Sequence, residues 1–181
     1  LDHRPVRSMI GDLVKGKSFL NLFCYTAAAS VQAALAGAKS SLSIDMSNTY
    51  LDWAGRNFEL NSMSASKHQL LRADCLKWLE EEGELFDVIF LDPPTFSNSK
   101  KMDSVLDIQR DHGDMIRNAM ARLAADGVLI FSNNFRKFKM DELTLRQFDC
   151  ENITPETLDM DFERNPRIHN VWKITRRSSF G

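Results

Sequence analysis

Three aspartates, Asp45, Asp74 and Asp92, each stand at the carboxyl end of a short strand-like run. Because the carboxyl ends of parallel strands meet at one edge of an open α/β sheet, where ligands bind, these side chains should share one site. Asp45 stands where an acid binds the two hydroxyls of a ribose. Asp74 could accept a hydrogen bond from an exocyclic amine such as that of adenine. A single aspartate could equally cap a helix, but three at one edge favour a pocket for a nucleoside without phosphates.

The third aspartate opens the sequence Asp92-Pro93-Pro94-Thr95-Phe96. The apolar run 86–91 before it predicts a buried parallel strand, which the two prolines end. A carboxylate, a stiff proline pair and an aromatic ring suit a flat, hydrogen-bonding substrate such as a nucleobase. An ordinary turn after a strand would explain these residue types equally well.

The loop after the first predicted strand reads Tyr25-Thr26-Ala27-Ala28-Ala29-Ser30 and contains no glycine. A dinucleotide pyrophosphate needs a glycine-rich turn that lets it approach the backbone at a helix N-terminus. Small residues still allow a ligand to come close, but the missing glycines disfavour NAD.

Strand and helix patterns alternate five times along the chain, which predicts a mostly parallel α/β sheet with helices on both faces. Two final strands without a full helix between them predict an antiparallel hairpin at one edge of a seven-stranded, Rossmann-like sheet. We expect one domain spanning residues 1–181, as a fragment of a longer chain because residue 1 is Leu. The expected helices are 4–14, 27–35, 47–61, 74–82, 105–123 and 141–148, and the expected strands are 18–24, 42–45, 68–72, 86–91, 128–131, 153–158 and 171–175.

Composition excludes several classes of protein. The chain has 43% hydrophobic and 27% charged residues and a net charge of −2, so we expect an ordered protein without a generally basic coat. Cys24, Cys75 and Cys150 are far apart and odd in number, which predicts reduced thiols in the cytoplasm and no zinc site. The most apolar window, 19–38, is interrupted by polar residues and does not predict a membrane span.

Longer stretches carry a more specific signal. The segments FLNLFCYTAAASV, SIDMSNTYLDWAGRNFELN, FDVIFLDPPTFSNSK and DFERNPRIHNVWKIT resemble the C-terminal methyltransferase half of the bifunctional bacterial 23S rRNA guanine methyltransferases, the RlmKL family. The resemblance spans nearly the whole chain. It implies a class I fold that uses S-adenosyl-L-methionine (SAM) and leaves S-adenosylhomocysteine (SAH), with methyl transfer to N7 of a guanine in 23S rRNA. It also implies an N-terminal half that bears a THUMP domain and a second methyltransferase.

The resemblance further implies which residues bind the cofactor. SAM would lie against the segment 21–30, with Asp45 on the ribose, Asp74 on the adenine amine and Met46 beside the adenine, although Met46 could equally be a core residue. Relatives usually have a glycine where this chain has Ala27, and alanine would be strained if that position needs a positive φ. The expected cofactor-binding residues are Asn21, Phe23, Tyr25, Thr26, Ala27, Ser30, Asp45, Met46, Ser47, Asp74, Cys75 and Asp92.

The expected catalytic residues are Asp92, Pro93, Pro94 and Phe96. The Asp92 carboxylate and the Pro93 carbonyl would accept hydrogen bonds from guanine, and Phe96 would stack on the base. Guanine N7 has a lone pair and no proton, so its attack on the methyl group needs no general base. A guanine-N2 or adenine-N6 methyltransferase, or a SAM- or RNA-binding module without activity, remains an alternative. A cytosine-C5 mechanism is disfavoured because Ser132-Asn133-Asn134 stands where a nucleophilic cysteine is expected.

The segment 135–139 alternates aromatic rings and cations directly after a strand end, which suits an RNA surface; the alternative is a basic loop with both rings packed in the core. Lys100, Lys101, Arg110, Arg164 and Arg167 could extend that surface, and His112 and His169 could reach the pocket or serve as structural hydrogen-bonding residues.

Overall fold

The computed structural model describes residues 3–97, 105–157 and 169–178 of the chain. Within these ranges the dominant feature is a seven-stranded sheet with the strand order β3-β2-β1-β4-β7-β9-β8. The pairs β1–β2, β2–β3, β1–β4 and β4–β7 are parallel, and β9 pairs antiparallel with both β7 and β8. The predicted mostly parallel sheet with an antiparallel edge hairpin is therefore confirmed.

The elements follow the apolar runs closely. The strands of the large sheet are β1 (Ser18–Leu22), β2 (Ser40–Asp45), β3 (His68–Arg72), β4 (Phe86–Leu91), β7 (Leu123–Asn133), β8 (Phe148–Asn152) and β9 (Asn170–Arg176). The helices are α1 (Arg4–Val14), α2 (Ala28–Leu35), α3 (Asn48–Leu60), α4 (Cys75–Glu80), α5 (Ile108–Ala121) and α6 (Glu142–Gln147).

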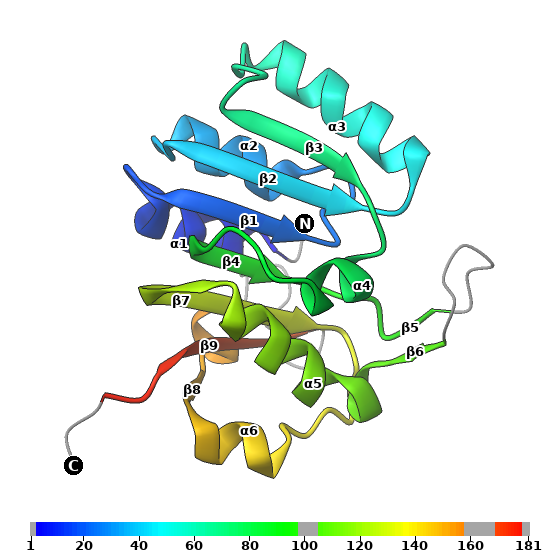
Figure 1. Cartoon of the computed structure of the whole chain (residues 1–181), viewed down its shortest axis with the longest axis vertical. Coiled ribbons are helices and arrows are strands. Elements are labelled where there is room, and N and C mark those ends of the chain that lie inside the picture. Colours follow the sequence, from blue (N-terminus) through cyan, green and yellow to red (C-terminus); the bar gives the residue numbers. More distant parts are fainter. Residues whose placement is uncertain (1–2, 98–104, 158–168, 179–181) are drawn as a thin grey trace.

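Helices cover both faces of the sheet (Figure 1). On one face Val6 and Ile10 of α1 pack with Phe19 of β1 in one apolar cluster. On the other face Leu20 of β1 packs with Ile116 of α5 in a second, larger cluster. Because neighbouring strand residues point to opposite faces, the fully buried run of β1 supplies both layers. The two layers fix the central strands, whose carboxyl ends hold the candidate site.

Two helix starts agree with the sequence. The Ser47 hydroxyl accepts a hydrogen bond from the Tyr50 N–H at 3.3 Å and caps α3. The Asp74 carboxylate accepts one from the Leu76 N–H at 3.0 Å and caps α4. Each cap satisfies a backbone N–H that has no partner within the helix. Both residues therefore have structural roles at the same strand ends that the sequence marked as a binding site.

The prediction of a strand at 153–158 was wrong. The edge strand is β8 (Phe148–Asn152), and Thr154–Thr157 forms a 3-10 helix, η1. Pro155 explains this outcome, because proline cannot donate a hydrogen bond to a neighbouring strand. The helix expected at 105–123 begins only at Ile108, because Leu106–Asp107 forms a strand, β6, that pairs antiparallel with β5 (Phe96–Ser97). This small hairpin stands directly after the two prolines and orients Phe96.

No helix among the described residues is long and apolar enough to span a membrane.

Candidate functional site

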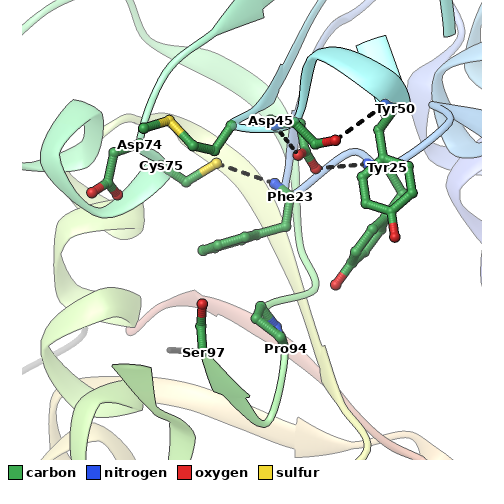
Figure 2. Close-up of a pocket in the computed structure, with 10 residues that line it drawn as sticks. Phe23, Tyr25, Asp45, Tyr50, Asp74, Cys75, Pro94 and Ser97 are labelled. Atoms are coloured by element: carbon green, nitrogen blue, oxygen red, sulfur yellow. Dashed lines mark hydrogen bonds between the residues drawn. The ribbon is translucent and has the colours of Figure 1, made fainter. Parts of the chain in front are cut away.

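A cavity of about 370 Å³ lies at the carboxyl ends of β1, β2 and β3, beside the loop that follows β4. Its lining comes from four separate stretches of sequence. Figure 2 shows Asp74 and Cys75 on one side of the Phe23 ring, and Pro94 and Ser97 on the other. The residues that line it are Phe23, Tyr25, Asp45, Met46, Ser47, Tyr50, Asp74, Cys75, Pro94 and Ser97. The strand ends thus form one mostly apolar hollow with carboxylates at its wall, as nucleoside sites require.

Asp45 is the most firmly held carboxylate of this cavity. It is 7% exposed, and its two oxygens accept hydrogen bonds from the backbone N–H groups of Tyr25 at 3.0 Å and Ser47 at 2.9 Å. A carboxylate has about four lone-pair sites, so acceptor capacity remains for two ligand hydroxyls. Asp45 therefore joins the loops after β1 and β2 and still lines the cavity.

The loop after β1 has an unusual backbone. Phe23, Tyr25 and Ala27 have φ angles of 56°, 52° and 60°, in the left-handed region that L-residues adopt at a cost of about 1–2 kcal/mol each. Neighbouring groups hold it, since Phe23 N–H donates to the Cys75 sulfur at 3.3 Å and Cys24 N–H donates to the Ile44 carbonyl at 3.0 Å. The positive φ of Ala27 means that this position carries the strain expected of an alanine in a left-handed backbone.

Burial keeps the groups around this loop neutral. It raises the pKa of the Cys75 thiol, and it raises the pKa of the Tyr25 hydroxyl together with the nearby carboxylates of Asp92 and Asp45. Cys24 is also buried, and burial raises the pKa of its thiol. A thiol with a raised pKa is a poor nucleophile. Covalent catalysis by Cys24 or Cys75 is therefore not supported.

Asp92 lines a second, smaller cavity of about 130 Å³, which shares Phe23 and Tyr25 with the large one. Asn21 and Thr26 line this small cavity too. The Tyr25 hydroxyl donates to the Asp92 carbonyl at 3.2 Å, which ties the loop after β1 to the loop after β4. The Asp92 carboxylate lies 3.7 Å from Nδ1 of His3. The two cavities thus meet at Tyr25, with Asp92 on one side and Pro94 on the other.

Phe96 is 59% exposed, and its ring meets Phe135 edge to face with the centroids 6.0 Å apart. Pro94 lines the large cavity, whereas Pro93 is buried. The loop after β4 therefore contributes an exposed aromatic ring, Phe96, and a proline, Pro94, that lines the large cavity. An exposed ring beside a cavity is a surface on which a base can stack.

Two expected cofactor residues line neither cavity. Ala27 and Ser30 are fully buried, and the Ser30 hydroxyl binds the Asn21 amide at 2.9 Å and the Ser43 hydroxyl at 2.6 Å. Ala27 and Ser30 therefore support the loop after β1 from the protein interior.

Neither histidine that could reach the pocket lines one of these cavities. His112 is 1% exposed and accepts a hydrogen bond at Nε2 from the Asp141 N–H at 2.8 Å, and burial lowers its pKa. His169 is fully buried and binds the Thr157 hydroxyl at 3.0 Å.

In the segment 135–139 the rings of Phe135 and Phe138 pack against the core cluster while the three cations are exposed. Arg110 forms an exposed pair with Asp111, and Lys100, Lys101, Arg164 and Arg167 lie outside the described residues.

Sequence reasoning missed five residues that line the two cavities. Tyr50 and Ser97 line the large one, and His3, Arg7 and Phe90 line the small one. Tyr50 meets Tyr25 edge to face with the centroids 5.6 Å apart. Tyr50 reaches the large cavity from the first turn of α3, and His3 and Arg7 reach the small cavity from the start of α1. Because these positions depend on how the helices pack, no local sequence motif predicts them. No group of His, Cys, Asp and Glu within the described ranges could hold a metal ion.

Comparison with known proteins identifies the family of this chain. The family model described as conserved hypothetical protein 95 matches residues 5–146. The chain belongs to this family. The Ribosomal RNA large subunit methyltransferase K/L of Marinomonas sp. (strain MWYL1) is 60% identical over 177 residues, which are 98% of this chain and 24% of that protein. The chain thus spans about a quarter of the curated relative it matches.

Solved structures of the same fold agree. SMU.776, described as a methyltransferase and crystallised in complex with SAH, has a TM-score of 0.78 and 26% identity, over 96% of this chain and 49% of that chain. A protein from Streptococcus mutans described as a SAM-dependent methyltransferase has a TM-score of 0.75 and 25% identity, over 96% of this chain and 48% of that chain. The resemblance to the K/L methyltransferases and the predicted SAM-dependent methyltransferase fold are confirmed.

Proposed function

We propose that this chain binds SAM at the carboxyl ends of β1 to β4 and transfers its methyl group to N7 of a guanine in large-subunit (23S) rRNA. The observation that carries the proposal is the shared cavity, in which Asp45 and Asp74 face the same hollow as Pro94 of the loop after β4. The names of the relatives, Ribosomal RNA large subunit methyltransferase K/L, support the choice of rRNA.

The cavity fits the nucleoside of SAM. Within the described part of the chain Asp45 accepts hydrogen bonds only from backbone N–H groups, so the ribose hydroxyls would bind its remaining lone pairs. Asp74 would accept from the adenine amine, and Met46 and Phe23 supply apolar walls for the ring. Among the residues that the structure describes, no glycine-rich turn or cluster of cations lines this cavity, which suits a nucleoside without phosphates.

The acceptor base would lie against the loop 92–96. SAM supplies an electrophilic methyl group on a sulfonium. The chain's part is to hold the base in line with it, between Pro94 and the exposed Phe96 ring, and this alignment alone can lower the barrier by several kcal/mol. Methylated guanine gains positive charge, which the nearby carboxylate of Asp92 would stabilise. The absence of a general base from this scheme agrees with His112 and His169 lining neither cavity.

The remaining contacts with RNA would come from the exposed cations of the segment 135–139, beside the Phe96–Phe135 ring pair. We further propose that the chain is one methyltransferase domain of a longer cytoplasmic protein. In that protein an N-terminal half with a THUMP domain would contribute to capture of the RNA. This chain covers only 24% of the length of its Marinomonas relative, which supports the proposal that it is part of a longer protein.

The test is methyl transfer from labelled SAM to unmodified 23S rRNA, followed by digestion to nucleosides and mass spectrometry. We expect 7-methylguanosine with the wild-type chain and a loss of product of at least tenfold with Phe96→Ala. SAH binding should be unchanged, because Phe96 lines neither cavity. Trp53→Ala is the matched control, since Trp53 is a similarly exposed aromatic residue, 57% against 59%, on α3.

Two results would contradict the proposal. N2-methylguanosine or N6-methyladenosine as the product would overturn the acceptor atom and leave the cofactor in place. No binding of SAM or SAH by the folded chain would overturn the enzyme assignment and favour a module without activity.

A further inference from the structure

The segment that joins β7 to α6, residues 134–141, contains a tight turn that carries cations. The Phe138 N–H donates to the Phe135 carbonyl at 3.1 Å, which closes a β-turn with Arg136 and Lys137 at its two central positions. The rings of the two flanking phenylalanines pack against the core cluster, whereas Arg136 and Lys137 are exposed. The turn therefore holds two positive charges at the surface on an apolar base.

The start of the turn is anchored by two asparagine side chains. The Asn133 Oδ1, which is fully buried, accepts a hydrogen bond from the Phe135 N–H at 3.0 Å. The Asn170 amide, on β9, donates to the Phe135 carbonyl at 2.8 Å and to the Asn133 Oδ1 at 3.1 Å. Phe135 thus enters the turn with both of its backbone polar groups bound, and its ring meets Phe96 of the loop after β4.

The end of the turn is held by two side chains of α5. The Gln109 amide binds both backbone groups of Lys139, 30 positions away in sequence: its Nε2 donates to the Lys139 carbonyl at 2.8 Å, and its Oε1 accepts from the Lys139 N–H at 2.9 Å. His112 accepts at Nε2 from the Asp141 N–H at 2.8 Å, because its Nδ1 must donate to the Ile108 carbonyl. The backbone therefore has a fixed course on both sides of the cations.

Gln109 is the informative member of this set. It is exposed and lines neither of the two cavities, so neither core packing nor the cofactor accounts for it. Both of its printed hydrogen bonds hold a single residue, Lys139, which is itself an exposed cation. A loop that is already ordered loses less conformational freedom when it binds, and this preorganisation raises affinity.

We propose that Gln109 is a positioning residue for RNA binding. Its amide fixes Lys139, and with it the turn 135–138, so that the three cations of the segment 135–139 stand in place before RNA binds. This inference rests on the proposed function, because it assumes that these cations contact RNA phosphates. Gln109 acts through the loop and contacts neither the cofactor nor the reacting atoms.

Gln109→Met tests the inference, since methionine keeps the length of the side chain and loses both hydrogen bonds to Lys139. Gln32→Met is the matched control, because Gln32 is an exposed glutamine within another helix, α2. The variant R136Q/K137Q/K139Q removes the three cations and keeps Gln109, and a fourth variant combines all four changes. For each protein we would measure kcat, KM for unmodified 23S rRNA, SAH affinity and Tm.

We expect Gln109→Met to raise KM for the rRNA about three- to tenfold, because the released loop must be ordered when RNA binds. Its kcat and SAH affinity should stay within about twofold of the wild-type values, and hydrogen exchange at the Lys139 N–H should be faster. In the protein without the three cations, adding Gln109→Met should change KM by less than about twofold, since no charges remain to be positioned. Gln32→Met should behave as the wild-type chain does.

Equal effects of Gln109→Met with and without the three cations would overturn the inference and assign Gln109 a structural role alone. An unchanged KM, or a fall in kcat without a rise in KM, would overturn it too. A variant without the three cations that keeps the wild-type KM would instead refute the RNA surface of the proposed function, and this inference with it.

Discussion

Replacing Asp45 by alanine should destabilise the chain in the absence of any ligand. The buried carboxylate accepts two backbone N–H groups, from Tyr25 at 3.0 Å and Ser47 at 2.9 Å. Removing it leaves both donors without their partner at the wall of a cavity. Each hydrogen bond to a charged group contributes about 1.5–3 kcal/mol, and water entering the cavity would replace part of this. We therefore expect a loss of about 2–4 kcal/mol in the free energy of unfolding.

For a chain of this length that loss corresponds to a fall in Tm of about 5–15 °C. Circular dichroism without ligand would measure it. Asp45→Asn keeps one acceptor oxygen and should lose about half as much, and Asp52→Ala removes an exposed carboxylate on α3 as a control for charge. An Asp45→Ala variant as stable as Asp52→Ala would refute the reasoning, because Asp45 would then serve the ligand alone. SAH affinity, measured separately, should fall in both Asp45 variants.

Two further predictions concern the loop after β1 and a buried histidine. Ala27→Gly should change the free energy of unfolding by less than about 1 kcal/mol. Glycine would relieve about 1–2 kcal/mol of backbone strain at φ 60°. This gain is offset because the variant loses a buried methyl group and its unfolded chain is more flexible. A loss above about 2 kcal/mol in urea titrations would show that the left-handed backbone is not strained. Stability should also fall as the pH drops below 6.5, the ordinary pKa of histidine, since burial lowers the pKa of His112 and the folded chain binds fewer protons than the unfolded chain. In His112→Gln the decline below pH 6.5 should be shallower, and an equal slope in both proteins would contradict this origin.

The sequence predicted the central sheet well because its strands are buried on both faces. The range expected for β4 matches the structure, since nearly all its residues are buried and short apolar runs of this kind have few other stable arrangements. The edge is different. β8 reads FDCEN, and most of its side chains are exposed or only partly buried, so no hydrophobic pattern marks it. The more apolar run that follows, 153–158, predicts a strand instead, although Pro155 argues against a strand there.

For the candidate site, too, the sequence predicted some residues and missed others. Asp45, Asp74 and Pro94 were found because strand ends in a parallel sheet meet at one edge, a rule that needs only the order of the elements. Arg7 and Tyr50 were not found, because their position depends on how α1 and α3 pack against the sheet. His112 has the residue type of a catalytic group, but its burial between α5 and the core appears only in the structure.

A crystal structure of the chain with SAH would test the proposed cofactor site. We expect the ribose hydroxyls on Asp45, the adenine amine near Asp74, and the sulfur facing the loop 92–96 beside Pro94. SAH bound outside the cavity at the strand ends, or inside it with the sulfur turned away from that loop, would show that this cavity does not position a methyl donor.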